Sequence, residues 1–170
     1  FRRVLFRSAL GLLSQGSSEA SQLALALVIG VSAGLLGALF GRLLLATRLW
    51  LKDRVRRRPL RTGLFLGLAL TLLTLVSGGA AGGDGEGLMG DMIADLDQQV
   101  APMRWVILLL CRVLGPCLAL GVGVPGGLID PAFTIGAVLG HGLGSLGALQ
   151  GLGLAIGMTA ALAGATQLPV

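Results

Sequence analysis

The sequence predicts an all-α, multi-pass membrane protein with broken or re-entrant helices, and three observations support this fold class. First, 54% of the 170 residues are hydrophobic and 12% are charged, about half the charged fraction of an average soluble domain. Second, residues 23–41 and 63–83 are uncharged, and a helix needs about 20 apolar residues to cross a bilayer. Third, a Gly/Pro-rich stretch at residues 121–130 interrupts the apolar C-terminal half. This composition excludes a soluble enzyme domain, a disordered chain and a disulfide scaffold.

Apolar runs and their boundaries place the individual helices. The first uncharged run is expected to continue as a helix to Lys52, and Pro102 suits the first position of the third span. Apolar residues at helical spacing in the acidic segment that follows the second run indicate a short interfacial helix. Residues 131–170 hold no charged residue and are long enough for two helices. We therefore expect long helices over residues 21–52, 61–77, 103–121 and 131–146, a shorter one after Gly151, and no sheet.

Charge is distributed unevenly along the chain. Through Arg61 there are 11 Lys/Arg and two acids, whereas from Thr62 onward there are two Arg and six acids. The arginine-rich run fits either a nucleic-acid patch or the positive-inside rule of membrane proteins, and the apolar spans on both sides favour the second. We therefore expect no nucleic-acid partner, a cytosolic basic loop at residues 54–61 and an external acidic segment at residues 84–97.

Glycines recur four residues apart within the expected helices. This spacing lets helices approach one another closely in lipid, so it indicates a tightly packed bundle rather than a binding site. The sets are Gly30/Gly34, Gly37/Gly41, Gly136/Gly140/Gly144 and Gly153/Gly157.

The Gly/Pro-rich stretch carries the chemistry. Its G-x-G-x-x-G spacing lacks the strand and the acidic residue of a dinucleotide site, but non-helical backbone at membrane depth survives only where it is buried in protein or lines a watery cavity. Asp130 and Pro131 are typical of an N-cap and a first helical residue. A helix that begins inside a membrane presents N–H groups and a positive dipole end, which predicts an anion site.

The same residues resemble a known family. Residues 124–131 (VPGGLIDP), followed directly by AFTIGAVLG, resemble the third conserved motif of the CLC family of voltage-gated chloride channels and chloride/proton antiporters. GMTAALAG at residues 157–164 and the glycine-rich residues 77–79 and 85–87 are similar to further parts of that family's transport domain. The resemblance covers residues 23–170. It implies chloride transport across a lipid bilayer by a protein that is a homodimer at full length, with no catalytic residue, metal or cofactor.

The resemblance also implies which groups bind the anion. The backbone amides of Gly127, Leu128 and Ile129 are expected to face it, and Ile129 stands where the family has a phenylalanine. Asp130 departs from the family, which has a small or apolar residue at that position. It is expected to be either the N-cap of a helix starting at Pro131, pointing away from the pore, or a gating carboxylate. The capping hypothesis predicts that Asp130→Asn leaves the pH profile of chloride flux largely unchanged.

The chain is expected to be a piece of a longer protein. Residues 1–8 (FRRVLFRS) resemble a translated sequencing adapter and are set aside, which leaves residues 9–170 as a partial CLC-like transmembrane domain. By resemblance this is the second half of the transport domain, with the gating-glutamate motif upstream and the pore tyrosine and any regulatory domains downstream. We expect that the chain does not conduct alone and that its location is a bacterial inner membrane.

Further polar residues and function classes leave alternatives open. His141 is either a hydrogen-bonded residue at a helix end or a proton relay, and Glu86 is either a solvated loop residue or a proton acceptor. Arg112, inside a span, forms a structural ion pair or serves the pathway.

Ser77 with His141 suggests an intramembrane serine protease, but no second His or Asp is placed to complete a relay. Another broken-helix solute transporter is the remaining alternative, and within the CLC family both a channel and an exchanger fit.

Overall fold

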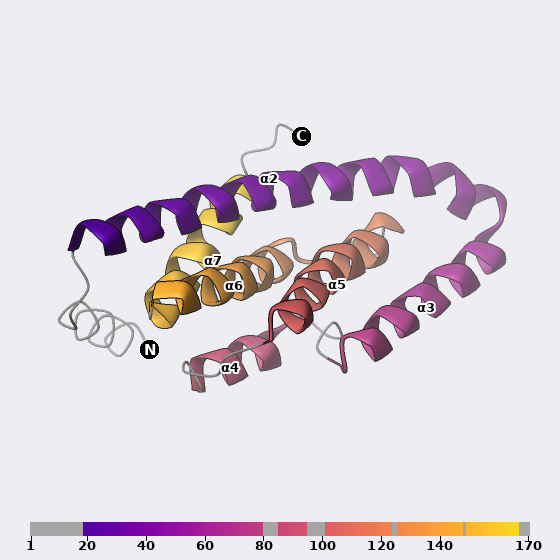
Figure 1. Ribbon diagram of the computed structural model, residues 1–170. Helices are drawn as coiled ribbons and strands as arrows, with labels where there is room; N and C mark the ends of the chain where they lie inside the picture. Colours follow the sequence, from indigo (N-terminus) through magenta and orange to yellow (C-terminus); the bar gives the residue numbers. More distant parts are fainter. Residues whose placement is uncertain (1–18, 80–84, 95–100, 124–125, 148, 167–170) are drawn as a thin grey trace.

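The computed structural model describes residues 19–79, 85–94, 101–123, 126–147 and 149–166, and the statements below concern these residues. Their regular elements are all helices, without a strand, which confirms the predicted all-α fold (Figure 1). Residues 1–8 lie outside the described part of the chain. The elements are α2 (Glu19–Arg57), α3 (Pro59–Val76), α4 (Glu86–Ala94), α5 (Pro102–Gly121), α6 (Ile129–Gly144), the 3-10 turn η1 (Ser145–Gly147) and α7 (Gln150–Thr166).

Proline ends the longest helix. α2 continues five residues past the predicted Lys52 and stops at Arg57, because Pro59 has no N–H and its ring clashes with the preceding turn. α3 begins with Pro59 in its first turn, where the missing N–H has no helical partner to lose. Arg58 lies between the two helices as the N-cap of α3. The predicted start of this helix, at residue 61, is therefore two residues late.

The helices divide into long and short ones. α2, α3 and α5 are long and apolar enough to cross a membrane, and α4, with nine residues, is the expected short helix. α6 and α7 have 16 and 17 residues, so they reach about 24–26 Å, less than the ~30 Å of a hydrocarbon core. Such lengths fit the broken or re-entrant architecture. The last helix is nevertheless not shorter than α6, so that detail of the prediction is wrong.

α6 and α7 pack with their backbones in contact. A methyl group on Gly136 would collide with the carbonyl of Gly157, and one on Gly140 would collide with the carbonyl of Gly153. The paired residue numbers run in opposite directions, so the two helices are antiparallel and η1 joins them. The N-terminal half of α2 lies across the pair, and its C-terminal half extends past them toward α3 (Figure 1). The same kind of backbone contact joins α2 to α7 at Gly34, Gly37 and Gly164, which confirms the predicted dense packing.

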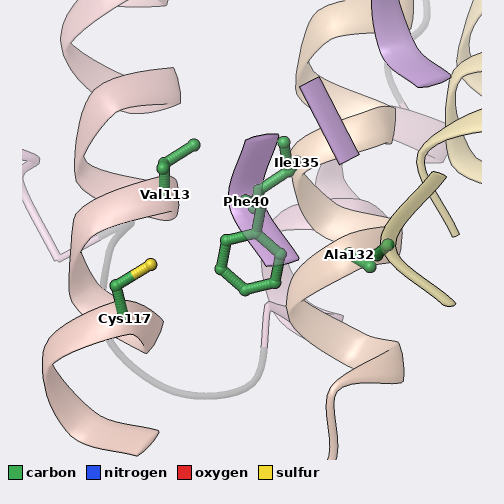
Figure 2. Close-up of a cluster of buried hydrophobic side chains, with 6 residues drawn as sticks. Phe40, Val113, Cys117, Ala132 and Ile135 are labelled. Atoms are coloured by element: carbon green, nitrogen blue, oxygen red, sulfur yellow. The ribbon is translucent and has the colours of Figure 1, made fainter. Parts of the chain in front are cut away.

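Phe40 connects three helices in the buried core. Its ring extends from α2 into the space between α5 and α6, with Val113 and Cys117 on one side and Ala132 and Ile135 on the other (Figure 2). Because lipid tails are as apolar as these side chains, this cluster stabilises the bundle through van der Waals packing rather than through removal from water. The cluster holds the first half of α6 against α2 and α5, which fixes the place where α6 begins.

Candidate anion site

The break between α5 and α6 lies in glycine-rich backbone, as the sequence predicts. α5 ends at Gly121, and Gly123 has a φ of +88°, a conformation that glycine adopts without steric cost. A Cβ on Gly121 would lie 2.8 Å from Cγ2 of Thr47 on α2, so the end of α5 is held closely against α2. Residues 126 and 127 are non-helical. Residues 124 and 125 lie outside the described part of the chain.

The helix that follows begins earlier than predicted. α6 starts at Ile129, and its N-cap is Leu128, which makes no side-chain capping hydrogen bond. Asp130 and Pro131 are therefore the second and third helical residues, and the prediction that Asp130 caps a helix starting at Pro131 is wrong. The physical reason is that none of the first three helical N–H groups has an acceptor within its own helix. A proline, which lacks the N–H, fits the third of these positions as well as the first.

Backbone N–H groups at the start of α6 have no hydrogen-bond acceptor within the helix. The first helical hydrogen bond runs from the Ala132 N–H to the Leu128 carbonyl at 3.3 Å, so the N–H groups of Ile129 and Asp130 have no helical acceptor. Leu128 has no side-chain oxygen of the kind that Ser, Thr, Asp or Asn supplies at a cap. The neighbouring Gly127 and Ile129 are exposed. The arrangement suits an acceptor from outside the chain, such as water or an anion.

The carboxylate of Asp130 lies near these donors. A Cβ placed on Gly127 would be 3.7 Å from Asp130 Oδ2, so the exposed carboxylate turns back toward the loop instead of pointing away from it. The positive end of the α6 dipole favours a negative charge in the first helical turn. The carboxylate can accept hydrogen bonds from the same loop amides that would donate to an anion. Asp130 is therefore placed to affect an anion at this position.

A buried junction supports the first turn of α6. The Thr134 hydroxyl donates a hydrogen bond of 2.7 Å to the Asp130 carbonyl, and Thr134 is fully buried. A Cβ on Gly85 would lie 2.8 Å from Thr134 Cγ2 and 2.9 Å from Arg112 Nη1, so all three residues meet at one point between α4, α5 and α6. Arg112 is 3% exposed and thus faces protein, not lipid. The sequence singled out Arg112 but gave no signal for Thr134.

The other polar residues singled out by the sequence are dispersed. Glu86 is exposed, as predicted, but it is the first residue of α4 and not a loop residue. His141 is buried in the last turn of α6, and Ser77 is the C-cap of α3, where its hydroxyl donates to the Thr74 carbonyl at 3.0 Å. The C-terminal ends of α3 and α6 lie well apart (Figure 1), so Ser77 and His141 do not form a catalytic pair. Within the described ranges, no three metal-binding side chains come together.

A family match covers nearly all of the sequence. Residues 2–170 match the voltage gated chloride channel family. The chain belongs to this family. Its members are channels and transporters, and neither the serine protease nor an unrelated solute transporter is favoured. The family assignment confirms the resemblance carried by the glycine-rich break and the helix that follows it.

A curated relative gives the same assignment. The chain is 32% identical over 132 residues to the H(+)/Cl(-) exchange transporter ClcA of Vibrio campbellii (strain ATCC BAA-1116). The aligned part is 76% of this CLC-family chain and 27% of the exchanger, so the chain spans about a quarter of the relative that it matches. No solved structure matches the chain. Membership of this family and three helices that are long and apolar enough to cross a membrane together identify the chain as part of an integral membrane protein.

Proposed function

We propose that this chain forms part of a chloride pathway across a membrane, in a CLC-type channel or proton-coupled exchanger. The observation that carries the proposal is the start of α6, where a glycine-rich break leads into a helix whose N-cap has no side-chain acceptor. The amides of Gly127, Leu128 and Ile129 are the proposed anion ligands. Family membership and the similarity to a chloride/proton exchanger support chloride as the anion.

The chemistry of such a site suits transport rather than storage. Backbone N–H groups and the positive end of a helix dipole carry partial charges, which attract an anion without the full charge of a lysine or arginine. Conduction needs binding that is favourable enough for entry and weak enough for exit. The only formally charged side chain in the first turn of α6 is Asp130. Its sign opposes an anion, so it would weaken binding further.

The partners and location of the longer protein are also proposals. The Vibrio relative supports a bacterial inner membrane and a lipid bilayer as the environment. A homodimer is expected from the family resemblance. The segments that would bear the gating glutamate and the pore tyrosine are expected outside residues 9–170, so the activity is assigned to the longer protein and not to this chain alone.

Substitution of Ile129 tests the backbone site in the full-length protein. Ile129→Pro removes one N–H donor at the first helical position and also strains Leu128, whose αR conformation a following proline disfavours, whereas Ile129→Ala removes the side chain and keeps the N–H. A hydrogen bond to a charged group contributes about 1.5–3 kcal/mol, so Ile129→Pro should weaken chloride binding by about 10- to 100-fold. Chloride efflux from liposomes at graded chloride concentrations measures the change, and circular dichroism confirms that both variants remain helical.

The alanine variant separates the backbone from the side chain. It should transport with nearly the parent's affinity for chloride. Equal losses in Ile129→Pro and Ile129→Ala would show that the side chain matters and the N–H does not. Absence of chloride efflux from the unmodified full-length protein would refute the proposed function itself.

Asp130 is proposed to compete with the anion for the same amides. Because Asp130 is not the N-cap, Asp130→Asn tests competition with the anion rather than loss of a cap. The carboxylate repels the anion, whereas asparagine carries no charge. The ratio of variant to parent chloride flux should therefore exceed one, and a ratio of one would leave Asp130 without a role in anion handling.

A further inference from the structure

The corner where α2 meets α3 gathers most of the positive charge of the molecule. Asp53 is the only carboxylate between residues 48 and 61, and the cations at this corner are all exposed. Six of them are arginines, whose planar guanidinium groups form paired hydrogen bonds with phosphate oxygens. We define the basic corner as Arg48, Lys52, Arg54, Arg56, Arg57, Arg58 and Arg61.

The length of α3 places the corner at the level of lipid headgroups. α3 has 18 residues, so it is about 27 Å long, close to the ~30 Å thickness of a hydrocarbon core. Its sequence is uncharged after Arg61. α2, with 39 residues, is about 58 Å long and extends beyond one membrane thickness. The two helices join at one end of the molecule (Figure 1), so the cations lie where the apolar spans stop.

A tryptophan at the same level points to the membrane interface independently of the charges. The guanidinium of Arg54 stacks over the Trp50 ring, with its Cζ atom 3.6 Å from the ring centroid. Trp50 is 53% exposed, and tryptophan is enriched at headgroup level because its ring is apolar and its N–H is polar. The stacking covers one face of the Arg54 guanidinium with the Trp50 ring, and the N–H groups at the edge of the guanidinium can still donate hydrogen bonds. An oriented edge of this kind suits a phosphate group.

Exposed leucines between the cations exclude a purely aqueous partner such as a nucleic acid. Leu60 is 88% exposed and lies between Arg58 and Arg61, and Leu64, one turn further, is 77% exposed. A nucleic-acid backbone offers phosphates to the arginines but no apolar phase to these leucines. A phospholipid offers both, because its acyl chains lie directly beneath its phosphate. Charge and apolar exposure together favour lipid.

We propose that the basic corner binds the headgroups of anionic phospholipids in the membrane that the protein spans. This proposal depends on insertion of the chain into a membrane and not on chloride transport. If lipid binding is refuted, the proposed chloride function still stands, and the reverse is also true. A Lys or Arg near a membrane surface gains about 1 kcal/mol from anionic lipid. One cation per headgroup therefore gives about a fivefold preference for an anionic over a zwitterionic headgroup. The preference should depend on ionic strength, because exposed charges are screened by salt.

Lipid retention by the purified chain tests the proposal. The whole chain is reconstituted with equal amounts of phosphatidylglycerol and phosphatidylcholine, extracted in mild detergent, and the retained lipids are counted by native mass spectrometry. Arg56→Gln/Arg57→Gln/Arg58→Gln should reduce the retained ratio of phosphatidylglycerol to phosphatidylcholine by about twofold, because the fivefold preference is lost at three of the seven cations. The matched triple lysine variant keeps the charge and should retain most of the preference. Arg104→Gln removes a single exposed arginine at the start of α5, outside the basic corner, and should reduce the ratio much less than the triple glutamine variant does.

Several outcomes would overturn the proposal. These are an unmodified chain with no preference for phosphatidylglycerol, a triple glutamine variant that keeps the preference, or an equal loss in Arg104→Gln. Binding of a DNA duplex by the chain in phosphatidylcholine nanodiscs, without a preference for anionic lipid, would assign the corner to nucleic acid instead. If the glutamine variant loses helicity, the salt dependence of the unmodified chain decides. Its preference should fall severalfold between about 50 mM and about 500 mM NaCl, and a constant preference would refute the electrostatic basis.

Discussion

Gly140 lies where α6 and α7 touch backbone to backbone, and its replacement by alanine is expected to destabilise the bundle. The added Cβ would lie 2.7 Å from the carbonyl carbon of Gly153 and 3.1 Å from the Cα of Gly157. Both are backbone atoms, which cannot rotate away as the end of a side chain does. Non-bonded carbons prefer separations of about 3.5–4.0 Å, so the two helices must move apart by about 1 Å.

The cost of this separation follows from the lost packing. Each pair of atoms in contact attracts with about 0.1–0.2 kcal/mol, and a gap of about 0.5–1 Å removes a quarter to a half of that attraction. Over roughly 40 atom pairs along the helix interface, the loss is about 1–4 kcal/mol. Alanine recovers about 0.5–1 kcal/mol relative to glycine in a helix. We therefore expect Gly140→Ala to lower the free energy of unfolding by about 0.5–3 kcal/mol.

Gly67 on α3 provides the matched control. No described atom lies within 4 Å of a Cβ placed there, so Gly67→Ala should be neutral or stabilising by up to about 1 kcal/mol. Unfolding of the purified chain in detergent micelles, followed by circular dichroism, measures both variants against the parent. Equal effects of the two substitutions, or a Gly140→Ala chain as stable as its parent, would refute the close-packing argument.

Two further predictions concern the other end of α6 and the orientation in the membrane. Gly85→Ala should lower stability by about 1–3 kcal/mol more than Gly87→Ala in the same unfolding assay. Gly85 has a φ of +98° and its Cβ would meet buried side chains of α5 and α6, whereas that of Gly87 meets nothing within 4 Å. Equal effects would contradict the junction. Arg58→Cys should be labelled by an impermeant maleimide only from the cytosolic side and Glu86→Cys only from outside, and outside labelling of Arg58→Cys would reverse the orientation.

The helices were predictable because their signals are local. Uncharged runs and prolines place α2, α3 and α5 within about five residues, and the glycine spacing of α6 and α7 predicts their close approach. The end of α2 was misplaced because the arginine run is polar and still an excellent helix former. Only Pro59 stops it, through the loss of an N–H and a steric clash that apolar periodicity does not register.

The candidate site was predictable in kind but not in detail. Glycine-rich backbone inside an apolar region indicates a break, and the helix after it indicates an anion site. The meeting of Gly85, Arg112 and Thr134 depends on the way α4, α5 and α6 pack, so no spacing along the chain contains it. Thr134 in particular looks like any helical threonine until its hydroxyl is seen to bond the Asp130 carbonyl at 2.7 Å.

The misassigned cap bears directly on how α6 could serve an anion. A polar N-cap side chain satisfies the second or third helical N–H and stabilises a helix by about 0.5–2 kcal/mol. With Leu128 at that position, the helix forgoes this stabilisation, and the packing of Phe40 and Ile135 against α5 holds its start in place instead. The first-turn donors are then open to an acceptor that can leave. On the proposal made above, Asp130, one turn before Thr134 and beside the loop, competes with an incoming anion for these donors.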